Sequence, residues 1–138
     1  MKTYAVKKVA VSFNGQILSG FMAGTFVEIA FDSDAFAKDT GSQGEVSRVA
    51  LADEGATIKI TLQQTSASND VLSAALANDR LTQNGTGVIF IKDTSGRTVA
   101  QGAEAWVKKS ADVKFTNGAE GREWTIDTGI LKMTVGGN

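Results

Sequence analysis

The stretch Thr57-Ile58-Lys59-Ile60-Thr61-Leu62-Gln63 alternates polar and apolar residues along its whole length. Successive side chains of a β-strand point to opposite faces, so this period of two predicts a strand with one buried and one polar face. Other strand-like runs lie on both sides of it. The expected strands cover residues 5–13, 25–32, 45–52, 56–64, 87–92, 97–108 and the chain from about residue 122 onward.

Two short turns separate some of these strands. Asn14-Gly15 follows the first strand and is the strongest short hairpin signal, because both central positions of such a turn accept positive φ. Ile17 and Phe21 then suggest a returning strand. Asp93-Thr94-Ser95-Gly96 predicts a tight turn between residues 87–92 and 97–108.

One helix is expected, over residues 69–82. Its apolar stripe has helical spacing and consists of Val71, Leu72, Ala75 and Leu76. Ser66 or Ser68 can cap its N-terminus, and Asp70 lies in its first turn. The helix should end near Asn84-Gly85. The sequence therefore predicts a mainly β fold with one α-helix.

The final strand reaches almost to the last residue. Chain ends usually fray unless something holds them, so this strand hints at a sheet edge that is paired, covered or shared with another chain. Its buried residues also change parity, because Trp124 and Ile126 are followed by Leu131, Met133 and Val135. We expect a β-bulge at Gly129 to restore one inward face.

The composition bounds the function. The chain has 138 residues, 42% of them hydrophobic and 21% charged, with a net charge of −1, which is typical of one globular domain spanning residues 1–138. It contains no Cys and no His, so thiolate metal sites are excluded and the commonest general base is missing. Lys and Arg are scattered, which argues against a nucleic-acid-gripping surface. We expect no enzyme activity, no metal and no cofactor.

Two polar clusters have only a superficial similarity to functional sites. Asp32-Ser33-Asp34 with Asp39 and Glu45 has some features of a calcium loop, but Phe36 stands where a third ligand belongs. The cluster Ser66-Ala67-Ser68-Asn69-Asp70 lacks the base that a serine nucleophile needs. We interpret the first cluster as a solvated acidic loop and the second as a helix start.

A long polar loop is expected from Ser33 to Gly44. At about twelve residues it is long for a compact β domain, and loops of this length are usually functional or disordered. It carries Ala35-Phe36-Ala37 in a polar setting. Phe36 either docks onto a partner or folds back on its own sheet, and the sequence leaves both possibilities open.

Four runs give the chain a family resemblance. They are residues 62–73 (LQQTSASNDVLS), 103–107 (AEAWV), 121–126 (GREWTI) and 135–138 (VGGN). Together they resemble the tail tube proteins of contractile-tailed bacteriophages, across nearly the whole chain.

The resemblance implies a β-sandwich or barrel-like protomer with one flanking helix, similar to the type VI secretion tube protein. It implies hexameric rings that stack into a hollow tube, through which phage DNA passes without specific binding during ejection. It also implies sheath, tape-measure and baseplate proteins as partners, and a place in the virion after assembly in the host cytoplasm. The same ring could serve a tailocin or a secretion system.

The resemblance also suggests two sets of site residues. In related tubes a long loop between two strands reaches toward the adjacent ring, which assigns inter-ring contacts to Asp34, Phe36, Lys38 and Asp39. Lumen-lining positions are assigned loosely to the polar faces of the strands near 25–32, 45–52 and 56–64, and in particular to Glu28, Thr57, Lys59 and Thr61. The family supplies no catalytic residues.

A second hypothesis is a monomeric β-sandwich that binds a small ligand or a carbohydrate. It requires Trp106 or Trp124 to be exposed in a concave site. The N-terminal residues lack the continuous apolar stretch of a signal peptide, and no segment is long and apolar enough to span a membrane. We therefore expect cytosolic synthesis and no membrane partner.

Overall fold

The computed structural model describes residues 1–138. Its elements, in chain order, are η1 (Val6–Lys8), β1 (Val9–Phe13), β2 (Gln16–Leu18), β3 (Val27–Phe31), β4 (Phe36–Thr40), β5 (Val46–Ala50), β6 (Ala56–Gln63), α1 (Ser68–Thr82), β7 (Gly87–Asp93), β8 (Val99–Lys109), β9 (Gly121–Thr128) and β10 (Leu131–Thr134). The prediction of a mainly β fold with one α-helix is confirmed.

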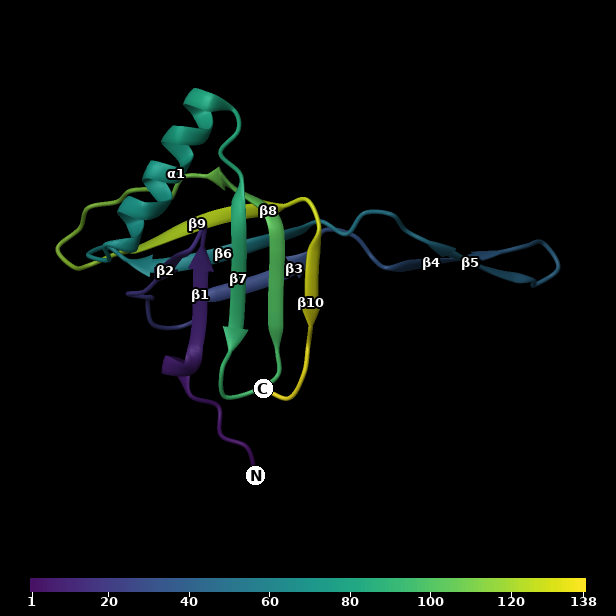
Figure 1. The fold of residues 1–138 in the computed structure, drawn as a ribbon. Helices are drawn as coiled ribbons and strands as arrows, with labels where there is room; N and C mark the ends of the chain where they lie inside the picture. Colours follow the sequence, from purple (N-terminus) through teal and green to yellow (C-terminus); the bar gives the residue numbers. More distant parts are fainter.

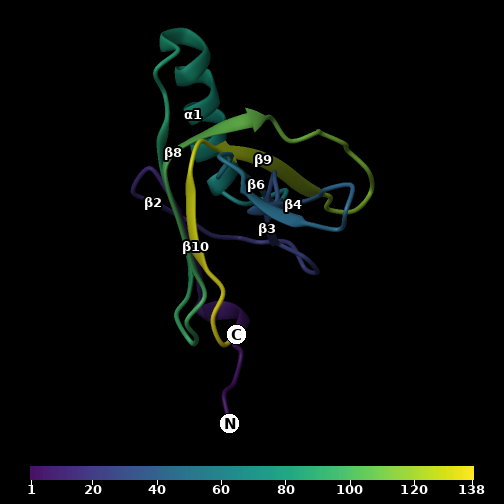
Figure 2. The same ribbon diagram turned by 90° about the vertical axis from the view of Figure 1, so that its right-hand side faces the viewer.

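The main sheet folds over on itself into two layers. Its strands follow the order β2-β1-β7-β8-β9-β6-β3, and β10 pairs with β8. Figure 1 shows β1, β7, β8 and β10 running together, while β9, β6 and β3 cross behind them. Figure 2, turned by 90°, separates the two layers and shows α1 at one end of both. The arrangement is a barrel-like sandwich with crossed layers.

Strand β8 bends so that it belongs to both layers. Its first residues, Val99–Gly102, pair with β10, and Ala105–Lys109 pair with β9. Its buried positions change parity at the bend, from Ala100 and Gly102 to Ala105 and Val107. The adjacent β9–β10 segment changes the parity of its buried positions at the same point. Thr128 is buried opposite Ala105, and Leu131 is buried opposite Gly102.

The predicted β-bulge at Gly129 is therefore wrong. Thr128 and Leu131 are three residues apart, as are their partners Ala105 and Gly102, so no extra residue enters the β9–β10 side. The register shifts of β8 lie elsewhere. On the β7 side, two steps from Gly87 to Ile89 face three steps of β8. On the β9 side, two steps from Val107 to Lys109 face the single step from Ile126 to Thr125. The two strands turn the corner together, which buries Leu131 as expected but leaves Val135 75% exposed.

The core lies between the layers and under the helix. It contains 17 buried hydrophobic residues, contributed mainly by the inward faces of β1, β6, β7, β8 and β9. The alternation of β6 is complete, since Ala56, Ile58, Ile60 and Leu62 are all fully buried. Leu72 of α1 is also fully buried, and Val71, Ala75 and Leu76 pack against the core, as the helical stripe predicted.

The start of α1 differs from the prediction. Ala67 is the N-cap residue and provides no side-chain cap, so neither serine occupies that position. Ser66 instead accepts a hydrogen bond from the Ser68 amide at its Oγ, 3.2 Å away. Ser68 is buried, and its Oγ accepts a hydrogen bond from the Ser19 amide at 2.9 Å. The Ser66 hydroxyl in turn donates to the Ser19 carbonyl at 2.6 Å, so both serines join the helix start to the residue after β2.

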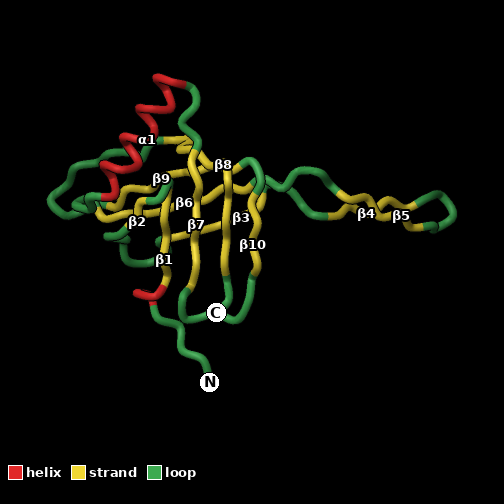
Figure 3. The backbone as a smooth tube through the Cα atoms, in the orientation of Figure 1, coloured by secondary structure: helices red, strands yellow, loops and turns green.

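The region predicted as a polar loop is a second, two-stranded sheet. β4 pairs with β5 in antiparallel register, from Phe36↔Ala50 to Thr40↔Val46. Figure 3 shows this hairpin as an extension of the β3–β6 connection that projects far from the two layers. The strand expected at 45–52 is present as β5. The loop prediction for 33–44 is wrong at β4, whose residues Phe-Ala-Lys-Asp-Thr do not alternate between apolar and polar and have no buried face.

Candidate functional site

The β4–β5 hairpin is the most exposed structured part of the molecule. All ten of its strand residues are exposed. It continues the β3–β6 pair through two hydrogen bonds, from the Asp32 amide to the Gly55 carbonyl at 3.0 Å and from the Leu51 amide to the Ala35 carbonyl at 3.0 Å. An isolated two-stranded hairpin is only marginally stable in water, so its connection to the β3–β6 pair helps to hold this one.

The two faces of the hairpin differ in charge. Cross-strand partners share a face, which places Lys38 beside Arg48 on one side and Asp39 beside Ser47 on the other. The first face is basic. The second face is acidic and carries smaller side chains. Like charges placed directly opposite each other destabilise a strand pair, so the basic face favours an acidic or polar partner surface.

The predicted inter-ring residues all lie on this hairpin or at its root. Asp34 precedes β4, whereas Phe36, Lys38 and Asp39 are within it. Phe36 and Lys38 share the basic face, and Asp39 is on the opposite face. Phe36 is 53% exposed and does not fold into the core; its ring lies 4.5 Å from the Arg48 guanidinium carbon.

A groove of about 550 Å³ lies between the hairpin root and β10. Phe31, Phe36, Leu51, Leu131 and Met133 supply its apolar wall. Asp53 and Glu54 add acidic groups to the same lining. β10 pairs only with β8, so its other edge, beside this groove, has no strand partner in the protomer.

The four residues assigned to the lumen share one surface. Glu28 lies opposite Lys59 in the β3–β6 pair, and both are exposed. Thr57 and Thr61 are half-buried positions of the same parity on β6. Glu28, Thr57 and Lys59 line a shallow hollow of about 250 Å³ on the outer face of the second layer. The structure thus brings three of the four together and places Thr61 further along the same face.

Charged groups of both signs lie on this outer face. Thr57 donates a hydrogen bond from Oγ1 to Asp32 at 2.7 Å, and Lys108 lies 3.7 Å from Asp127. Glu123 lies opposite Thr61. Residues 45–52, which were also assigned to this surface, do not belong to it, because β5 is part of the separate hairpin.

Neither tryptophan lies open in a concave site. Trp124 is only 3% exposed, and its Nε1 donates a hydrogen bond to the Asn69 Oδ1 at 2.9 Å. Trp106 is half buried on β8. The exposed stacking residue that a monomeric carbohydrate-binding module would need is therefore not provided by these rings.

No group of three or more acidic side chains is arranged to hold a metal ion. The acidic residues from 32 to 45 are distributed along the root and both strands of the hairpin. The Ser66–Asp70 cluster starts the helix. No helix combines the length and apolar character needed to cross a membrane.

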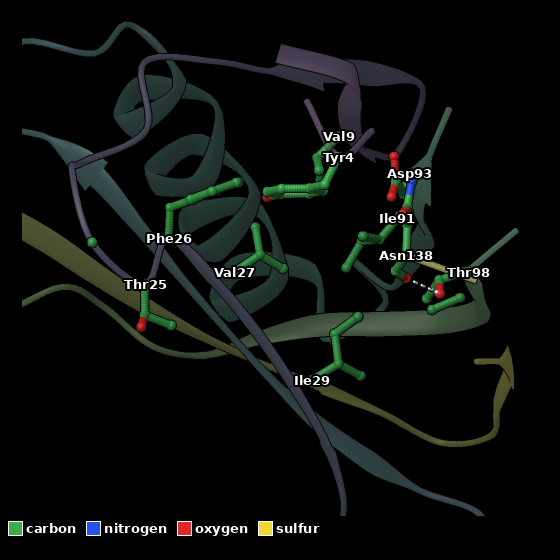
Figure 4. Close-up of a pocket in the computed structure, with 12 residues that line it drawn as sticks. Tyr4, Val9, Thr25, Phe26, Val27, Ile29, Ile91, Asp93, Thr98 and Asn138 are labelled. Atoms are coloured by element: carbon green, nitrogen blue, oxygen red, sulfur yellow. Dashed lines mark hydrogen bonds between the residues drawn. The ribbon is translucent and has the colours of Figure 1, made fainter. Parts of the chain in front are cut away.

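A feature that sequence reasoning missed is a cavity of about 420 Å³ between the layers (Figure 4). Ile91 and Asp93 of β7 line one wall and Val27 and Ile29 of β3 line another. Asp93 had been interpreted only as a turn residue. Its inward direction could have been predicted from its parity with Ile89 and Ile91, which alternate with exposed or half-buried positions.

Comparisons with known proteins agree on one family. The sequence matches the family model described as bacteriophage PhiTE tail tube protein over residues 1–136. A relative named structural protein ORF10, from Pseudomonas phage KPP10, is 31% identical over 144 residues, which cover 99% of this chain and 83% of the relative.

Solved structures of contractile injection systems share the fold. A chain from the sheath–tube complex of an extracellular contractile injection system, PVC, in its extended state has a TM-score of 0.62 and 14% identity, covering 96% of this chain and 91% of that chain. A chain from the anti-feeding prophage cap, which terminates the tube, has a TM-score of 0.62 and 11% identity, covering 97% and 92%. At these identities the likeness is one of fold.

Proposed function

Since this chain belongs to the bacteriophage PhiTE tail tube protein family, we propose that it forms hexameric rings that stack into the tube through which phage DNA is ejected. It is a structural protein of the phage tail and not an enzyme. The proposal concerns the manner of assembly: which edges join protomers, which segment joins rings, and which face surrounds the DNA.

The open strand edges support assembly into rings. β2 and β3 end the main sheet, and β10 has a partner on one side only. Unpaired strand edges are ready templates for pairing with another chain, and closing a ring removes them. Head-to-tail contact of unlike edges is the arrangement that generates rings from identical subunits.

The hairpin supports contact between successive rings. It projects away from the layers, its strands are exposed on both faces, and it carries apolar side chains beside its charges. We assign this contact to Asp34, Phe36, Lys38 and Asp39. The Phe36 ring and the Lys38 ammonium share one face of the hairpin and Asp39 lies on the other, so the proposed contact uses both faces, with Phe36 and Lys38 as its apolar and basic part.

The outer face of the β3–β6–β9 layer supports the assignment of the lumen wall. Glu28, Thr57, Lys59 and Thr61 present polar groups there, and the charges of Glu28 and Lys59 offset each other. DNA is held chiefly through neutralisation of its phosphates by basic side chains. A wall of mixed charge would let DNA pass without retaining it.

The partners follow from this arrangement. The outside of such a tube would be covered by a sheath, as in the sheath–tube complex that shares the fold. A tape-measure protein would occupy the lumen before DNA does, and a baseplate would start the tube. Assembly would take place in the host cytoplasm, before the finished tail becomes part of the virion.

Mass measurement and negative-stain imaging of the purified protein test the proposal. The expected result is six-membered rings, or tubes with a ring repeat, that form in a concentration-dependent way. A protein that stays monomeric at high concentration would contradict the assembly. Rings with another number of subunits would contradict the hexamer while leaving the tail tube family unchanged.

A further inference from the structure

Asp93 places an unpartnered carboxylate oxygen between the two layers. It is 7% exposed and has the same inward parity as Ile89 and Ile91. Its Oδ1 accepts hydrogen bonds from the Ser95 amide at 3.0 Å and from the Ser95 hydroxyl at 2.6 Å. Its Oδ2 is buried without a hydrogen-bond partner, the one side-chain atom of the molecule in that situation.

A buried carboxylate oxygen without a donor is costly, and such an atom in a native fold asks for an explanation. The ion pairs of this protomer, Lys108–Asp127 and Lys109–Asp112, are elsewhere. The turn that follows β7 uses only Oδ1. The Oδ2 atom is therefore not required by the turn, and Asp93 is one of the residues that line the cavity.

The walls of the cavity define what that group can be. Val9, Val27, Ile29, Ile91 and Ala100 make most of the lining apolar. Tyr4 and Phe26 add two aromatic rings, and Figure 4 shows them reaching toward each other across the cavity, above Val27. Apolar walls accommodate methylene groups, while aromatic faces and a carboxylate both attract a cation.

From this combination we propose that the cavity binds an alkylammonium group, with its carbon chain between β3 and β7 and its ammonium at Asp93 Oδ2. The ammonium donates to the oxygen that has no partner in the free protomer, and the chain covers the half-buried Val27 and Ile29. This site does not depend on the ring assembly proposed above. The same chemistry is available from a small free alkylamine or from a lysine side chain of a second copy.

Calorimetric titration of the full chain with n-butylammonium chloride tests the site. 1-Butanol, which has the same number of heavy atoms and no charge, is the matched neutral probe. We expect butylammonium to bind more tightly than 1-butanol. Hydrogen exchange should show added protection in the segments around Val9, Val27 and Ile91, which surround the cavity.

Asp93→Asn keeps an Oδ1 acceptor for the Ser95 turn and removes the charge. It should weaken butylammonium binding by at least about tenfold, the size expected when a buried charge pair loses one member, and leave 1-butanol unchanged. Val27→Phe, on an edge strand, fills the cavity and should weaken both probes while Asp93 stays intact. Asp70→Asn, at an exposed position in the first turn of α1, is the control and should change neither.

Three results would overturn the proposal: no butylammonium binding to the wild-type chain, equal binding to Asp93→Asn, or protection in another part of the fold. Sedimentation then separates dispersed from assembled protein and distinguishes the two sources. If a second copy supplies a lysine, butylammonium binds only the dispersed fraction. If the ligand is a free amine, both fractions bind it.

Discussion

Asn69 connects three parts of the fold through one side chain. Its Nδ2 donates to the carbonyls of Gln63 and Ser66 at 3.0 and 3.1 Å, and its Oδ1 accepts from the Trp124 indole at 2.9 Å. The amide therefore ties the end of β6, the start of α1 and the middle of β9 together. Both of its ends are needed, since one donates and the other accepts.

Asn69→Asp separates these two roles. The carboxylate can still accept from Trp124 but faces carbonyl oxygens where Nδ2 donated, so we expect a loss of about 2 kcal/mol in the free energy of unfolding. A negative charge in the first turn of a helix stabilises it by less than that, about 0.5 kcal/mol. Urea denaturation of the dispersed protein measures the difference.

The control for that substitution is Asp70→Asn, which removes the neighbouring first-turn charge and should cost only about 0.5 kcal/mol. If Asn69→Asp proved as stable as the wild type, the hydrogen bonds to Gln63 and Ser66 would carry no weight, and the connection between helix and sheet would rest on apolar packing alone.

At the scale of elements, the β1–β2 hairpin depends on backbone conformation. Asn14 and Gly15 have φ values of 51° and 81°, as the Asn-Gly signal predicted. A Cβ added at Gly15 would meet no atom within 4 Å. The requirement for glycine at this position is therefore conformational and not steric.

Gly15→Ala should lower the free energy of unfolding by about 1 kcal/mol, because a Cβ disfavours the left-handed region. Gly118→Ala is a matched control, since a Cβ there also meets nothing within 4 Å and its φ is not positive. Thermal unfolding of the two variants compares them directly. Equal stability would mean that the turn relaxes to another type without cost.

At the scale of the whole molecule, the shape is a two-layered body with one long arm. In the proposed stack of rings, the arm carries the contact to the next ring and the strand edges carry contacts within a ring. The two kinds of contact lie on different elements. A change confined to the arm should thus alter stacking and leave ring formation intact.

Lys38→Glu tests this separation. The change removes the like-charge pair with Arg48, so the hairpin itself should become more stable. We expect rings to persist while tubes become shorter or disappear in electron micrographs, because the basic face is reversed. Lys92→Glu, on an exposed position of β7, makes the same charge change away from the arm and should leave tube length unaltered. Tubes of normal length from Lys38→Glu would exclude this face from the contact.

The sequence predicted the strands and the helix that bury one face. It did not predict features that depend on how two strands pair, because a single segment does not show its partner. The spacing of the apolar residues predicted β6 and α1 correctly, because a regular period marks the face that packs into the core. These residues are Ile58, Ile60 and Leu62 in β6 and the stripe around Leu72 in α1. β4 was missed because its residues Phe-Ala-Lys-Asp-Thr do not alternate between apolar and polar. The parity change near Gly129 was visible, but its cause was not, because the matching change at Ala103 lies on the partner strand. Asp93 carried a turn signal that concealed its inward direction.

The corner shared by β8 and the β9–β10 connection also constrains how chains of this fold can change in length. Both strands cross the corner with two residues, 103–104 in one and 129–130 in the other. Deleting one residue between Gly102 and Ala105 would therefore put every later side chain of β8 on the wrong face. A second deletion between Thr128 and Leu131 would bring the two strands back into step. Insertions and deletions at these two places should therefore be tolerated only in pairs. The two places are far apart in sequence, since Ala103 and Gly129 are separated by 26 positions.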